Sequence, residues 1–171
     1  MRRLTSRRSR FIFLGLVALL LTTPHAEAGD SSVDRNTLKG MNALSVITEF
    51  LDPDVEREGL TRSQIQIAVE PHLREAGIRV VPEYSPPLPY LYVQVDTRMT
   101  KSGFFAYSVR LDLKQPGVLS RDPNIEHPAV VTWSVETVGA LNANRLYEIR
   151  PRVIDLVERF IAAYLEQNPH Q

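Results

Sequence analysis

The chain has 171 residues, with 20 basic and 20 acidic side chains and no cysteine. Residues 1–28 hold five of the basic residues and one acidic residue, which leaves 15 basic and 19 acidic groups and a formal charge of −4 on residues 29–171. This balance gives no electrostatic support for binding nucleic acid or anionic lipid, which need a basic face. The lack of cysteine means that packing, without disulfides, stabilises the fold.

The first 28 residues match a secretory signal peptide. The basic stretch MRRLTSRRSR precedes the apolar run FIFLGLVALLL, and small residues stand at Ala26 and Ala28. The apolar run is shorter than the roughly 20 residues of a membrane span, so we predict cleavage after Ala28, no membrane span in the mature chain, and a periplasmic or secreted location. An uncleaved anchor is the alternative. Twin-arginine export is a further option, although Arg10 stands where that signal has a large apolar residue.

The mature chain is long enough for one domain, which we place at residues 38–168. Residues 29–37 are polar and rich in Gly and Ser, and they predict a flexible lead-in. Residues 42–51 follow with a period-2 pattern that predicts a first strand, with DPDVEREG as the turn after it. Leu44, Val46, Thr48 and Phe50 share one face of this strand.

A helix is predicted over residues 61–76. Thr61 and Gln64 form a capping box that satisfies backbone donors at the start of the helix. Gly77 stands where a helix ends in the left-handed conformation, and IRVV then leaves as a short strand. Pro71 removes a backbone hydrogen bond inside the helix, so we expect one kinked helix rather than two. Its apolar stripe consists of Ile65, Ala68, Val69, Leu73 and Ala76.

The Pro-rich segment PEYSPPLPY predicts a stiff extended connector. The alternating runs YLYVQVDTRM and FFAYSVRLDLK, joined by TKSG, predict an antiparallel hairpin with one buried face and one hydrated face. Opposed residues share a face, so Val95 should pair with either Tyr107 or Val109. Both pairings are open at this level.

The segment QPGVLSRDPNIEHP predicts a long loop, and AVVTWSVETV another strand with Val131, Trp133 and Val135 on its inner side. Apolar residues then recur at helical spacing up to Asn168-Pro169, with Asn144 as a candidate cap and Pro151 as a first-turn residue. The elements predict an α+β fold: a two-layer sandwich of an antiparallel or mixed four- to five-stranded sheet with two helices on one face. That face should carry Val93, Val109 and Trp133.

Two clusters resemble sites of chemistry. Glu70, His72 and Glu75 lie within two helical turns, but a zinc helix needs a second His four residues away, so His72 fits better as a residue at the edge of the apolar stripe. Asp122, Asn124 and Glu126 have the alternation of a calcium loop, but His127 and Trp133 occupy the positions that require Gly and an acid. We therefore expect no metal, no cofactor and no catalytic residue.

The outer face of the hairpin carries the strongest candidate for a binding surface. Tyr90, Tyr92 and Phe104 point away from the predicted core. Clustered exposed aromatic residues often mark a protein interface. The alternative is that the Pro-rich loop covers them. The hairpin edge could also accept an added strand from a partner.

The series GLT…VEPHLREAGIRVV…LYVQV…FFAYSVRLDL…VTWSV…FIAAYLEQNP resembles a group of uncharacterised small exported bacterial proteins over nearly all of the mature chain. The element layout is similar to the N-terminal domain of the Tol–Pal translocation protein and, more loosely, to the lipopolysaccharide-transport plug lipoprotein. The resemblance implies an envelope accessory domain, and it transfers no functional residue.

Three functions are therefore compared. The leading prediction is a non-catalytic exported accessory domain that binds a cell-envelope protein through Tyr90, Tyr92 and Phe104. The second is a carrier of a small apolar ligand or lipid held between helices and sheet. The third is a hydrolase or metal enzyme centred on His72 or His127.

Overall fold

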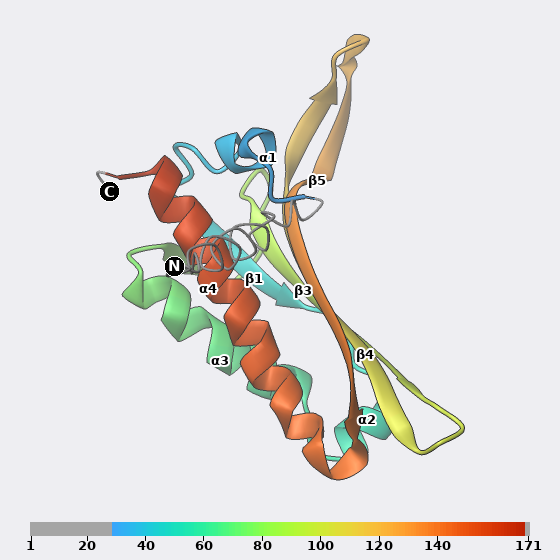
Figure 1. Ribbon diagram of the computed structural model, residues 1–171. Coiled ribbons are helices and arrows are strands. Elements are labelled where there is room, and N and C mark those ends of the chain that lie inside the picture. The colour runs from blue at the N-terminus through green and yellow to red at the C-terminus, as the bar shows by residue number, and fades with distance from the viewer. Residues whose placement is uncertain (1–28, 170–171) are drawn as a thin grey trace, which may run out of the picture.

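The computed structural model describes residues 29–169, so the predicted signal peptide and its cleavage after Ala28 lie outside the described residues. Figure 1 shows a sheet with helices packed against one face. The elements in chain order are α1 (Ser32–Asn36), β1 (Ala43–Thr48), α2 (Pro53–Arg57), α3 (Arg62–Glu75), β2 (Arg79–Val81), β3 (Tyr90–Met99), β4 (Phe104–Leu119), β5 (Asp122–Asn142), the 3-10 helix η1 (Ala143–Glu148) and α4 (Ile149–Gln167).

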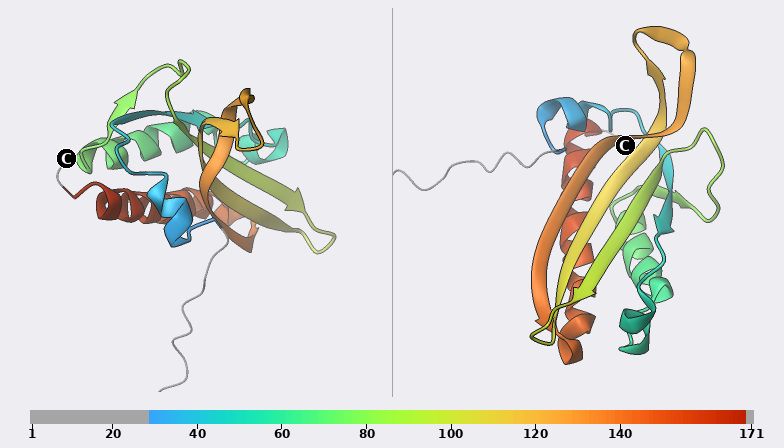
Figure 2. Two further views of the ribbon diagram at one scale, coloured as in Figure 1. Left: turned by 90° about the horizontal axis from the view of Figure 1, so that it is seen from above. Right: turned by 90° about the vertical axis from the view of Figure 1, so that its right-hand side faces the viewer.

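The strands form one open sheet in the order β2-β1-β3-β4-β5. Strand β1 runs parallel to β2 and β3, whereas β3, β4 and β5 form an antiparallel meander. Helices α3 and α4 lie side by side on the same face, as both views in Figure 2 show. The predicted α+β two-layer sandwich is confirmed, with a mixed five-stranded sheet. Within residues 29–169, no helix is both long and apolar enough to cross a membrane.

The core lies between the sheet and the two helices. Val93 and Val109 are 0% exposed and Trp133 is 1% exposed, which confirms the predicted inner face. The rings of Trp133 and Phe160 meet edge to face with centroids 5.2 Å apart. Val95 pairs with Val109, which settles the register of the hairpin.

Helix α3 forms as its sequence predicts. The Thr61 side chain accepts from the backbone of Gln64, and the Gln64 side chain accepts from the backbone of Thr61. At the other end Gly77 has a φ of +82°, and the Ile78 N–H donates to the Leu73 carbonyl at 3.0 Å, as in a Schellman motif. The helix continues through Pro71 as one element.

Residues 29–37, predicted as a flexible lead-in, contain α1 and are hydrogen-bonded to the sheet. The Ser134 N–H donates to the Gly29 carbonyl at 2.9 Å. Asp30 accepts from the Trp133 indole at 2.7 Å and from two nitrogens of Arg35 at 2.8 and 2.9 Å. Polar composition predicted a loop, but a buried carboxylate with three charge-assisted or indole donors anchors the segment.

Two shorter segments also differ from the prediction. The turn expected from residue 52 contains α2, with Pro53 in its first turn and the Asp52 side chain as its cap. Phe50, expected on the inner face of β1, lies beyond the end of that strand and is exposed, with the Arg62 guanidinium over its ring. The candidate cap Asn144 lies inside η1, and Pro151 falls in the first turn of α4 as predicted.

The largest difference concerns the segment QPGVLSRDPNIEHP, which was predicted as a loop. Strand β4 continues to Leu119 and β5 starts at Asp122, so the segment is a β-ribbon. Strand β3 begins at Tyr90, opposite Lys114, so residues 115–130 pair only with each other. We call residues 115–130 the arm; it projects beyond the rest of the sheet in Figure 1.

A register shift between β4 and β5, just before the arm, explains why Val131 is exposed rather than on the predicted inner face. Leu113 pairs with Trp133, but the next residue, Lys114, pairs with Val131, so the register shifts by one residue at this point. A shift of one residue moves a side chain to the opposite face of a strand. Val131 therefore points away from the core, whereas Trp133 and Val135 point into it.

Candidate functional site

The structure separates the three residues of the α3 cluster. Glu70 accepts from Arg74 at 2.6 Å and from Gln66 at 3.2 Å on the outer side of the helix. His72 instead contacts Glu158 of α4, with Nδ1 2.7 Å from Oε1. Glu75 is exposed at the end of the helix. The cluster therefore offers no shared site, and among residues 29–169 no group of three His, Asp or Glu is placed to hold a metal.

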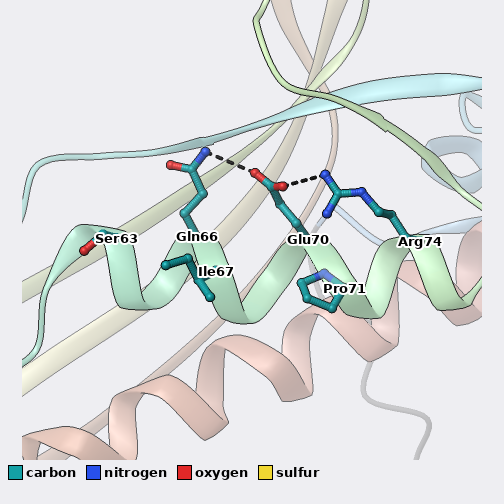
Figure 3. Close-up of a pocket in the computed structure, with 6 residues that line it drawn as sticks. All are labelled: Ser63, Gln66, Ile67, Glu70, Pro71 and Arg74. Carbon is teal, nitrogen blue, oxygen red and sulfur yellow. Dashed lines mark hydrogen bonds and ion pairs between the residues drawn. The ribbon is translucent and has the colours of Figure 1, made fainter.

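A shallow hollow of about 320 Å³ follows the outer side of α3 (Figure 3). Pro71 lies in its floor beside Ile67, which is largely exposed. Because Pro71 has no N–H, the Ile67 carbonyl lacks the donor it would have in an ordinary helix. The Gln66–Glu70–Arg74 chain of hydrogen bonds borders the hollow and leaves Glu70 neutralised by a cation.

The acidic segment 122–126 closes the turn of the arm. Asp122 Oδ1 accepts from both the backbone N–H and the side-chain nitrogen of Asn124, each at 3.0 Å. Glu126 lies two residues beyond Asn124 in β5 and is paired with Val118 of β4. Asp122 therefore performs the local turn-stabilising role that Asx residues commonly have.

The predicted aromatic surface divides into two places. Tyr90 and Tyr92 lie together, with ring centroids 6.3 Å apart, and Tyr84 of the Pro-rich loop packs 4.7 Å from Tyr90. Phe104 lies eight residues along β4 from Asp112, the partner of Tyr92. At the rise of a strand this is about 27 Å. Tyr90 and Tyr92 thus share a surface, and Phe104 belongs to the opposite end of the hairpin.

We call Tyr84, Tyr90, Tyr92 and Lys114 the tyrosine cluster. The Lys114 ammonium lies 3.8 Å from the centre of the Tyr92 ring, in a cation–π contact. Burial raises the pKa of both Tyr90 and Tyr92, and the Glu49 carboxylate raises that of Tyr92 further. Both phenols therefore stay neutral. The two rings are half-buried, which is intermediate between the exposed surface and the coverage by the Pro-rich loop that the sequence left open.

A groove of about 500 Å³ lies beside this cluster, between the Pro-rich loop and the arm. The view on the right of Figure 2 shows the loop and the arm projecting from the same end of the sheet. We call it the arm groove. The residues that line it are Pro86, Pro87, Pro116, Gly117, Val118, Glu126, His127 and Pro128.

The arm exposes more apolar surface than its polar composition suggests. Val118 is 61% exposed, Ile125 43% and Val130 39%, and Val131, directly after the arm, is 41% exposed. Sequence reasoning missed Val118 and Ile125 because the prolines and glycine around them indicated a loop. Val130 and Val131 were placed in the predicted strand AVVTWSVETV, with Val131 on its inner side. The available signal was the pair of valine- and isoleucine-containing runs on either side of residues 120–121, which a hairpin would place opposite each other.

The fold places the described residues in one class: an α+β domain with an open mixed sheet and both long helices on one face. No protein-family model and no curated protein sequence matches the chain. Among solved structures, the chain is similar to the rare lipoprotein B of Shewanella oneidensis, at 14% identity and a TM-score of 0.38, over 74% of this chain and 96% of that one.

A minor lipoprotein from Acinetobacter baumannii is similar at 12% identity and a TM-score of 0.36, over 71% of this chain and 91% of that one. Both neighbours are bacterial lipoproteins by name. At these values the likeness concerns only the general arrangement of helices and sheet. The expected likeness to the Tol–Pal domain stays a prediction.

Proposed function

We propose that this protein is a non-catalytic, exported accessory domain of the cell envelope that binds a partner protein through the arm and the tyrosine cluster at its root. The observation that carries the proposal is the exposure of Val118, Ile125 and Val130 on a ribbon that projects beyond the rest of the sheet (Figure 1). An isolated two-stranded ribbon is marginally stable in water. Contiguous exposed apolar side chains are typical of an interaction surface.

The non-catalytic part of the proposal is supported by how the candidate polar groups are used. Glu70 is engaged by Arg74, and His72 by Glu158. His127 accepts the backbone N–H of Ala129 through Nδ1 at 3.1 Å. A general base or nucleophile needs a neighbouring group that activates it and an open approach for substrate, and these side chains serve structural contacts instead.

The exported location is tested by the mature N-terminus. Protein recovered from the native envelope fraction should begin at Gly29, because Ala26 and Ala28 match a signal-peptidase site. Intact-mass measurement distinguishes this outcome from a retained leader. A mass that includes residues 1–28 would contradict cleavage and support the uncleaved anchor.

The partner proposal is tested with an arm-deleted variant, in which Asn-Gly replaces residues 116–129 and joins Gln115 to Val130. These two residues are directly paired, and Asn-Gly closes two-residue hairpins. Cross-linking in native cells followed by quantitative mass spectrometry should give an envelope protein bound to the wild type and lost from the variant. The same partner should be weakened by Tyr92→Lys.

Phe104→Lys is the matched control, because Phe104 is exposed on the same sheet at the far end of the hairpin. It should leave the complex unchanged. An unaltered complex with the arm-deleted variant, checked for folding by circular dichroism, would remove the arm from the proposal. A complex lost with Phe104→Lys alone would move the interface to the other end of the sheet.

The apolar-ligand carrier has less support. The space between helices and sheet is filled by side chains, among them Trp133, Phe160 and Leu111, each at most 1% exposed. Lipid extracted from the native protein at a stoichiometric ratio would nevertheless revive this function, and a clean mass spectrum would count against it.

A further inference from the structure

The arm groove has a chemistry that restricts its occupant. Four of its eight lining residues are prolines: Pro86, Pro87, Pro116 and Pro128. Proline supplies a carbonyl acceptor but no N–H donor. The walls are thus stiff, apolar and richer in hydrogen-bond acceptors than in donors.

The charge of the groove has one sign. Glu126 is its only charged lining residue apart from the titratable His127. The Pro-rich loop and the arm together contain Glu83, Asp122 and Glu126 against Arg121 alone. Lys114, at the root of the arm, points its ammonium onto the Tyr92 ring. The groove therefore favours a cationic, donor-bearing group.

The addition of a partner strand to a free edge of the arm is the less suitable mode of binding. Pro116 lies within β4, and Pro123 and Pro128 lie within β5. Prolines on free strand edges remove donors and deter the addition of another strand. The register also shifts between Gln115 and Gly117, which breaks the regular ladder that an added strand would need. An occupant must use side-chain contacts in the groove.

We infer that the arm groove binds an extended segment of a partner protein in which apolar side chains alternate with lysine or arginine. The apolar side chains contact Val118 and the prolines, and the cation pairs with Glu126. The ring nitrogen Nδ1 of His127 accepts from the Ala129 N–H, so Nε2 is the ring nitrogen that can donate to an occupant of the groove. This inference rests on the proposed function and specifies the partner's docking segment.

The test uses three fluorescent nine-residue peptides, with Leu-Pro-Lys, Leu-Pro-Glu or Ser-Pro-Lys repeated three times. Fluorescence anisotropy with the full mature protein should show saturable binding of the Leu-Pro-Lys peptide. The Leu-Pro-Glu peptide should bind about fivefold more weakly, which is the upper end of the effect of one exposed ion pair. The Ser-Pro-Lys peptide should also be weaker, because it lacks apolar side chains. Affinity for the first peptide should fall as salt rises.

Variants locate the site. Glu126→Lys should reverse the preference between the lysine and glutamate peptides, and Val118→Asp should weaken binding of both. Glu56→Gln is the matched control, since Glu56 is exposed on α2 at the opposite end of the molecule from the arm (Figure 1). It should leave all three affinities unchanged.

Four results would overturn the inference. Equal binding of the lysine and glutamate peptides removes the charge argument, and failure of all three peptides removes the groove as a peptide site. Unchanged affinities in Glu126→Lys place any binding elsewhere. Dimers in sedimentation experiments that Val118→Asp abolishes would make a second copy the occupant. If Val118→Asp loses the envelope partner while no peptide binds, the proposed function stands and this inference fails.

Discussion

Strands β4 and β5 run together through two different environments. In the body of the sheet, α4 packs against both strands, and Leu111, Leu113, Trp133 and Val135 are buried. In the arm the same two strands continue with valines and an isoleucine of similar character, and these are exposed. The difference lies in the covering layer rather than in the strand residues themselves.

The comparison shows how a β-ribbon can be stable as structure and still be open for binding. Burying an apolar side chain stabilises a fold by about 1.5–3 kcal/mol, and an exposed one contributes little of this. The body can therefore hold the arm in place through β4 and β5 without gaining from the arm's apolar residues. Changes in the body should affect stability, and changes in the arm should affect binding.

The largest effect is expected from Trp133→Ala, which removes the ring that packs on Phe160 and donates to Asp30. The free energy of unfolding should fall by about 3–5 kcal/mol, as for other buried aromatic residues. Urea unfolding followed by circular dichroism measures it. Val131→Ala, two residues away but exposed, should stay within about 0.5 kcal/mol; similar losses in both would break the comparison.

Asp30→Asn should have the next largest effect. Asp30 is held by Arg35 and Trp133, with Arg159 3.6 Å away. Loss of charge-assisted hydrogen bonds in a nearly buried site should lower the free energy of unfolding by about 2 kcal/mol at pH 7. A loss of this size would show that residues 29–37, which the composition predicted as a flexible lead-in, contribute to the stability of the body.

The same carboxylate predicts a pH dependence. Burial alone raises the pKa of Asp30, but the hydrogen bonds from Arg35 and Trp133 and the charges of Arg35 and Arg159 together lower it below 3.8. Its stabilisation is therefore complete above pH 3.8 and is lost as the pH falls through the lower folded pKa. The gap between wild type and Asp30→Asn should narrow in that acidic range; a gap that is constant down to pH 2 would contradict the assignment.

Two glycines sharpen the comparison further. A Cβ at Gly139 would lie 2.6 Å from the Tyr107 hydroxyl in the body, and a Cβ at Gly117 would lie 2.8 Å from a Val130 methyl in the arm. Gly139→Ala should cost about 1 kcal/mol because the Tyr107 ring must shift. Gly117→Ala should be near neutral, since Val130 can move into solvent and the alanine restricts the unfolded chain. Thermal unfolding of both variants measures these two changes in stability.

A small effect on stability is also expected from the arm-deleted variant, although it removes 14 residues. The free energy of unfolding should change by less than about 1 kcal/mol, because the deleted side chains bury little apolar area. Urea unfolding measures both this value and its denaturant dependence, which scales with the exposed surface. A loss of several kcal/mol would mean that the arm belongs to the core and would weaken its proposed role in binding.

Much of the body could be predicted because its signals are local. The capping box at Thr61, the left-handed end at Gly77 and the alternation through β3 each depend on neighbouring residues only. These rules also placed Trp133 on the inner face. The candidate surface was predicted in part: Tyr90 and Tyr92 lie together, whereas Phe104 needed the register of the hairpin to show its distance.

The sequence by itself determined where helices and strands form and which face of each is apolar, because periodicity and capping act within a few residues. Only the tertiary structure decided that the polar segment 29–36 is anchored, since its partner Trp133 lies about a hundred residues away in the chain. The tertiary structure also decided that QPGVLSRDPNIEHP forms an arm. The length of a ribbon depends on the pairing of two strands, and no local sequence pattern shows whether a helix covers them.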